Sequence, residues 1–86
     1  RIPAIKRAVD RRDLPAARQL VRDLRSDDAA IRLYAIEGLE RLTGETFGYR
    51  YYDDPLVRHE AIRRWEAWLK EQEKRKAEGG GQKAGG

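Results

Sequence analysis

The sequence predicts an all-α domain, and three observations carry this prediction. Apolar residues recur at intervals of three and four along four stretches of the 86-residue chain, which is the spacing of one helix face. Asp, Pro and Gly stand at the ends of these stretches, where helices begin and end. No pattern of alternating apolar and polar residues competes with them. We therefore expect an antiparallel array of about four helices.

Residues 3–11 and 14–25 form the first two expected helices. The first has Pro3 in its first turn, where the missing N–H costs nothing. The second has Asp13 as its expected N-cap and Pro15 just inside. The apolar stripes are Ile2, Ile5, Ala8 and Val9 in the first helix, and Leu14, Ala17, Leu20, Val21 and Leu24 in the second.

Residues 29–43 and 55–76 form the other two expected helices. Gly44 ends the third helix, and Asp54 with Pro55 begins the fourth. Their apolar stripes are Ile31, Tyr34, Ala35, Leu39 and Leu42, and Ala61, Ile62, Trp65, Trp68 and Leu69. The turn between the second and third helices is short, so these two helices should be antiparallel neighbours. The fourth is polar beyond its stripe, held by pairs such as Glu66 with Lys70, and we expect this end to project and fray.

The length and composition limit what else the chain can be. At 10.0 kDa, residues 1–77 are expected to make one domain with a thin core, and the Gly-rich residues 78–86 a flexible tail. No run approaches the roughly 18 apolar residues of a membrane span, so we expect a soluble protein. The chain has no Cys, which excludes disulfides and thiolate chemistry.

The charge is unevenly distributed along the chain. The net charge of +4 arises at the two ends, while the body between them is close to neutral. A nucleic-acid-binding surface needs Lys and Arg gathered on one face. The basic sequence pI therefore makes only a weak case for nucleic acid.

The residues that could carry catalysis are few. His59 is the only His and Ser26 the only Ser, and Ser26 stands in a turn where capping explains it. The paired carboxylates at 27–28 and 53–54 both precede expected helices, so capping accounts for them as well. A single His beside one Glu is not a metal site. We expect no enzyme activity, no cofactor and no metal.

The second and third expected helices resemble a known repeat. Leu20-Val21-Arg22-Asp23-Leu24, a polar turn, and the segment from Asp28 to Leu39 are similar to a HEAT repeat over about residues 14–43. Asp28, Ile31, Arg32, Ala35, Gly38 and Leu39 match its second helix, and Ala29 departs from its Pro. The segment from Leu42 to Tyr49, with Trp65 and Trp68, looks like the end of helical-repeat proteins of bacteria. The resemblance implies a protein-binding α-solenoid unit, with Asp28 and Arg32 as structural residues.

One repeat cannot bury both of its apolar faces alone. The expected first and fourth helices then act as flanking layers, or the chain is the C-terminal piece of a longer solenoid. Asp28 and Arg32 are also four residues apart, with the acid first, which predicts an ion pair on one helix face.

The aromatic loop between the third and fourth helices is the main candidate for partner binding. Phe47 and Tyr49 are expected to cover the core, while Arg50, Tyr51 and Tyr52 are candidate partner-binding residues, with at least one of the two tyrosines exposed. Trp65 and Trp68 are expected in the core. The outer face of the fourth helix adds Arg58, Arg63 and Arg64 as further candidates.

Two functions remain open from the sequence. The first is a noncatalytic protein-interaction or scaffold module of HEAT type. The second is a basic helical nucleic-acid-binding domain that uses the chain ends and the segment Arg50-Tyr51-Tyr52. Salt separates them, because phosphate contacts weaken steeply as salt rises and a mainly apolar protein interface changes little.

Overall fold

The computed structural model describes residues 11–85, with side chains for residues 12–75. Its elements are the 3-10 helix η1 (Arg11–Asp13) and the α-helices α2 (Leu14–Asp23), α3 (Ala29–Thr43) and α4 (Pro55–Gly85). No strand occurs in this part of the chain, so the prediction of an all-α fold is confirmed. The helix expected at 3–11 lies outside the described residues except for Arg11.

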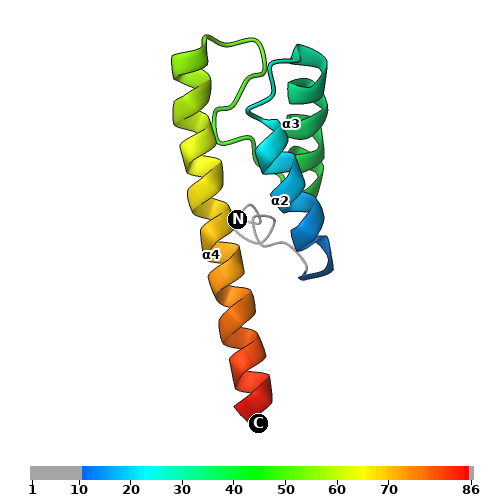
Figure 1. Ribbon diagram of the computed structural model, residues 1–86, viewed down its shortest axis with the longest axis vertical. Coiled ribbons are helices and arrows are strands. Elements are labelled where there is room, and N and C mark those ends of the chain that lie inside the picture. The colour runs from blue at the N-terminus through cyan, green and yellow to red at the C-terminus, as the bar shows by residue number, and fades with distance from the viewer. Residues whose placement is uncertain (1–10, 86) are drawn as a thin grey trace.

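Helix α2 lies at the centre of the fold. Figure 1 shows α2 and α3 as an antiparallel hairpin, with α4 running alongside α2 in the opposite direction to it. Helix α2 contacts both α3 and α4. The loop of residues 44–54 runs between the hairpin and α4 (Figure 1). Helix α4 is thus joined to the hairpin in two ways. It packs directly on α2, and the loop links it to α3.

The ends of α2 differ from the prediction. Asp13 occupies the N-cap position, but its backbone is helical (φ −91°, ψ −4°) and its side chain makes no capping bond. The expected cap is wrong because η1 already winds the chain before α2, whereas a capping residue has non-helical dihedral angles. At the other end, Leu24 donates its N–H to the carbonyls of both Leu20 and Val21, which tightens the last turn.

Helix α3 has the predicted bounds at both ends. Asp28 is extended (φ −85°, ψ 117°), and its carboxylate accepts the N–H of Ala30 at 2.9 Å. Gly44 follows the helix with φ 80°, the left-handed conformation that lets the chain leave a helix. One side-chain cap and one glycine therefore define this helix.

The buried face of α3 is turned relative to the predicted stripe. Ile31 is 43% exposed and Tyr34 is 78% exposed, while Ile36, which the stripe omitted, is buried. The prediction that Ile31 and Tyr34 face the core is wrong. Helix α3 packs against the 44–54 loop as well as α2, so its buried face is shifted toward the loop.

The core joins all three α-helices and the loop. Its largest fully buried side chain is Trp65, and Trp68 lies beside it with the two ring centroids 5.3 Å apart. The buried residues of this cluster are Ala17, Val21, Leu24, Ala35, Ile36, Leu39, Tyr49, Ala61, Ile62, Trp65 and Trp68. The core therefore depends on aromatic rings from α4 and the loop.

Helix α4 is longer than predicted. It continues to Gly85 instead of ending near residue 76, so residues 78–85, expected as a flexible tail, are helical. Extending an existing helix adds one backbone bond per residue without a new nucleation cost, so the helix continues through the Gly-rich residues. Among the described residues, no helix combines the length and hydropathy needed to cross a membrane.

Candidate interaction surface

A tight turn at residues 46–49 starts the loop. Tyr49 donates its N–H to the carbonyl of Thr46 at 3.0 Å, and the two central residues, Phe47 and Gly48, have φ of 55° and 78°. Positive φ at both positions is typical of a type I′ turn, and it is uncommon for a residue such as Phe. The Phe47 ring packs on Trp65 with the ring centroids 4.5 Å apart. This packing offsets the unfavourable backbone conformation.

Four helical side chains hold the loop by its carbonyl oxygens. Three of the donors come from α4 and one from α3. The bonds run from Trp65 Nε1 to Thr46 (2.8 Å), Arg64 Nε to Phe47 (2.9 Å), Arg32 Nε to Tyr51 (3.1 Å) and Arg58 Nε to Asp53 (2.9 Å). The loop is therefore fixed at both ends and in the middle.

Arg32 joins the hairpin turn to the loop. Its Nη1 donates to the carbonyl of Ser26 at 2.8 Å, and its Nε donates to the carbonyl of Tyr51. The ion pair expected with Asp28 does not form, because Asp28 caps α3 and the Arg32 guanidinium points to the two carbonyls. Asp28 and Arg32 therefore both stabilise the fold, and each does so by hydrogen bonds to backbone groups.

Tyr49 links the loop to the end of α2. Its side chain is 2% exposed, and its hydroxyl donates to the carbonyl of Leu24 at 2.8 Å. The carbonyls at the end of a helix lack helical partners, so this bond satisfies one of them inside the core. Burial raises the pKa of Tyr49 above its ordinary value of 10.0, although the guanidinium groups of Arg58 and Arg32 oppose the shift.

The raised pKa of Tyr49 predicts a loss of stability in alkali. Above pH 10 the unfolded chain releases the Tyr49 proton before the folded chain does, so rising pH favours unfolding. We expect the free energy of unfolding to fall more steeply between pH 9.5 and 11 in the wild type than in Tyr49→Phe. Urea denaturation across this range measures the difference, and equal slopes would contradict the prediction.

The middle of the loop presents three side chains, Arg50, Tyr51 and Tyr52, which we name the loop surface. Tyr52 is 67% exposed, while Tyr51 is half-buried and packs on the core. The two rings meet edge to face at 5.2 Å. The expectation that at least one of these tyrosines is exposed with Arg50 is confirmed.

Arg50 is held beside the Tyr52 ring. Its guanidinium carbon lies 5.8 Å from the centre of that ring, within cation–π range, and its Nε bonds Asp53 Oδ2 at 3.0 Å. The bond to Asp53 raises the pKa of Arg50 above its ordinary value, so the group stays charged. Tyr52 thus stands exposed between a half-buried ring and a fixed cation.

The three arginines predicted on the outer face of α4 do not gather at one place. Arg58 and Arg64 donate to loop carbonyls. Arg63 is exposed on another side of the helix. Arg58 and Arg64 therefore position the loop.

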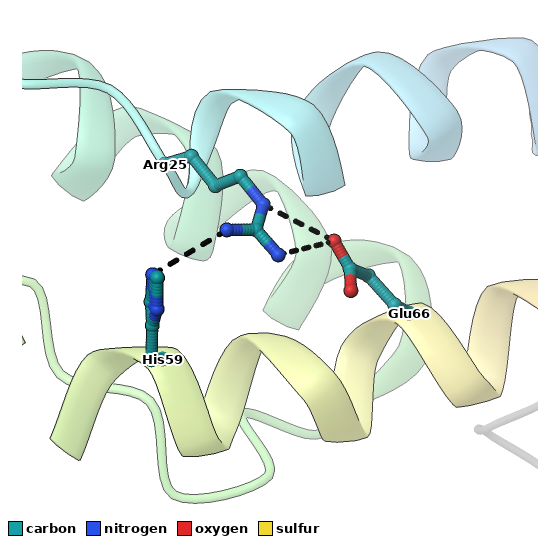
Figure 2. A network of polar contacts seen from close by, with 3 residues as sticks. All are labelled: Arg25, His59 and Glu66. Carbon is teal, nitrogen blue, oxygen red and sulfur yellow. Dashed lines mark hydrogen bonds and ion pairs between the residues drawn. The ribbon is translucent and has the colours of Figure 1, made fainter. Parts of the chain in front are cut away.

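A polar network that the sequence did not predict joins α2 to α4. Figure 2 shows Arg25, in the turn that follows α2, reaching Glu66 and His59 of α4. Its Nη2 lies 2.9 Å and its Nε 3.2 Å from Glu66 Oε2, and its Nη1 is 3.5 Å from His59 Nε2. Glu66 binds Arg25 instead of the Lys70 expected. The pairing spans 41 positions, so no spacing in the sequence marks it.

The described side chains form no metal-binding cluster. No group of three His, Asp or Glu residues that could hold a metal occurs among them. The hollow beside the network of Figure 2 is lined by Arg25, Asp27, Pro55, Arg58, His59 and Ile62, in which Arg25 and Arg58 already have partners. The loop surface remains the arrangement with exposed aromatic and cationic groups.

Comparison with known proteins identifies no relative of this chain. No family model matches the chain, and neither the curated proteins nor the solved structures contain a significant match.

Proposed function

We propose that this chain is a noncatalytic protein-interaction module, a short HEAT-like helical array that binds a protein partner through the loop surface. The observation that carries the proposal is Tyr52, an aromatic side chain 67% exposed on a loop whose backbone is fixed from α3 and α4. Tyr and Arg are enriched among residues that dominate binding energy. A fixed loop also loses little conformational entropy on binding.

The HEAT-like part of the proposal rests on the sequence resemblance over about residues 14–43, which fold as the antiparallel α2–α3 hairpin. Its two helices match the extent of the resemblance, and α4 provides a flanking layer on α2. Such units bind partners on their surfaces while each helix pair packs on its neighbours. The module would therefore act as a scaffold, with the loop surface as its recognition element.

Charge favours a protein partner over nucleic acid. Residues 12–75 contain equal numbers of basic and acidic side chains. Several arginines form ion pairs with acidic side chains of the same chain, among them Arg18 with Glu73 at 2.8 Å and Arg25 with Glu66. A phosphate-binding face needs cations that are gathered and available.

The double variant Arg50→Ala with Tyr52→Ala tests the loop surface. Both side chains are exposed, so we expect a thermal midpoint within about 2 °C of wild type. Binding to proteins captured by the immobilised full chain should weaken by about tenfold or more. The matched control is Lys70→Ala with Lys74→Ala, two exposed residues on α4, which should retain wild-type binding.

Salt and nuclease distinguish the two partner classes. A protein partner should remain bound after nuclease treatment and when salt rises from 50 to 200 mM. Loss of binding by about 10³-fold over that range, or on nuclease treatment, would favour nucleic acid instead. Equal binding by the double variant and wild type would remove the loop surface from the proposal.

A further inference from the structure

The outer side of the α2–α3 hairpin carries an exposed ring beside a hollow. The ring is Tyr34, which is 78% exposed. The hollow is lined by Tyr34 itself together with Leu20, Glu37, Gly38 and Arg41. A side chain at Gly38 would place its Cβ 2.9 Å from Leu20 Cδ1. Leu20 therefore packs directly against the Gly38 backbone, and a side chain at position 38 would displace it.

The lining of the hollow suits a phenol. Leu20 and the Gly38 backbone provide an apolar floor for an aromatic ring. Glu37 can accept a hydrogen bond from a phenolic hydroxyl, and Arg41 can donate one. A tyrosine side chain combines these two properties, and this same chain presents one at Tyr34.

We propose that α3 packs antiparallel on α3 of a second copy of this chain, with each Tyr34 seated in the hollow of the other copy. A twofold axis at the level of residue 36 places Tyr34 opposite Gly38 of the partner subunit. The same axis places Gly38 opposite Tyr34 of the partner subunit, so one contact is made twice. Ring and hollow are thus self-complementary.

The remaining exposed groups of α3 fit this arrangement. Ile31, 43% exposed, stands opposite Arg41 of the partner subunit, whose aliphatic stem can cover it. Arg41 and Glu37 of the partner subunit are offset by six residues, or about 9 Å along the axis. Side chains lean toward the N-terminus of their helix, and in antiparallel helices these two lean toward each other. Charge complementarity therefore occurs on both sides of the axis.

The dimer contact and the loop surface lie on different sides of α3. Arg32 donates to the loop carbonyl of Tyr51, and Tyr34, two positions further on, points about 200° away from it around the helix. Pairing through Tyr34 would leave Tyr52 exposed. A dimer would consequently present two loop surfaces.

Sedimentation equilibrium of the full chain tests the proposal. We expect a monomer–dimer equilibrium between about 10 µM and 1 mM protein, and a dimer dissociation constant raised about tenfold or more in Tyr34→Ala. The matched control is Leu56→Ala, which removes an apolar side chain of similar exposure (80%) on α4 and should change the constant by less than about twofold. A wild type that stays monomeric at about 1 mM, or equal effects of the two variants, would overturn the proposal.

A charge exchange and a cross-link test the geometry. Glu37→Arg should weaken the dimer, and combining it with Arg41→Glu should restore it. Circular dichroism first establishes that each variant is folded. A photoreactive phenylalanine at position 34 should cross-link to the peptide that contains Gly38 of the partner subunit. A cross-link to any other segment, or no recovery in the double variant, would rule out this pairing.

Discussion

Trp65→Ala is expected to lower the free energy of unfolding by about 3–5 kcal/mol, the range for removal of a large buried ring. Trp65 is fully buried, and its ring contacts both Phe47 and Trp68. Its Nε1 also donates to the carbonyl of Thr46. A domain of this size has about 4–13 kcal/mol of stability in total, so this one change removes a large share of it.

Urea denaturation followed by far-UV circular dichroism measures the loss, because the second tryptophan complicates fluorescence. Trp65→Phe is the control, since it keeps a ring in the core and loses the bond to Thr46. We expect it to cost clearly less than Trp65→Ala. A midpoint unchanged by Trp65→Ala would mean that the core does not depend on this ring.

Tyr49→Ala is expected to have a similar effect, about 3–5 kcal/mol. The ring fills the space between the hairpin and α4, and its removal opens a cavity there. The carbonyl of Leu24 also loses its only side-chain donor in the described structure. The loop then loses its contact with α2, and we expect the rest of its bonds to weaken.

Tyr49→Phe separates the contribution of the buried Tyr49 ring from that of its hydroxyl group. This variant keeps the ring and leaves the Leu24 carbonyl without the hydroxyl, at a cost of about 1–3 kcal/mol. Thermal and urea unfolding compare both variants with the wild type at pH 7. At this pH the wild-type Tyr49 hydroxyl is protonated in both the folded and the unfolded chain. If Tyr49→Phe were as destabilising as Tyr49→Ala, cavity formation would not be the main cost.

Local signals predicted the helices well. Asp28, Gly44 and Pro55 mark the ends of α3 and the start of α4 because each acts on the backbone next to it. The end of α4 was predicted less well, since continuation through the glycines has no such local marker. The burial of Tyr34 was also predicted wrongly, because a helical stripe does not specify which neighbours cover it.

The candidate site was predicted as a segment but not as a structure. The exposure of at least one of Tyr51 and Tyr52 followed from their adjacency, but which of the two is exposed did not. The bonds from Arg32, Arg58 and Arg64 to loop carbonyls did not follow from the sequence. A carbonyl is present at every position, so residue type carries no information about which one an arginine will reach.

The carbonyl bonds of the loop have a consequence for how its motion can be observed. The donors to Thr46, Phe47, Tyr51 and Asp53 are side chains, so these bonds do not protect the loop's own N–H groups from solvent exchange. Amide exchange reports on openings of bonds made by N–H groups, whereas relaxation order parameters report on motion in picoseconds to nanoseconds. The loop should therefore show high order parameters together with fast amide exchange at many positions, two results that would otherwise be read as contradictory.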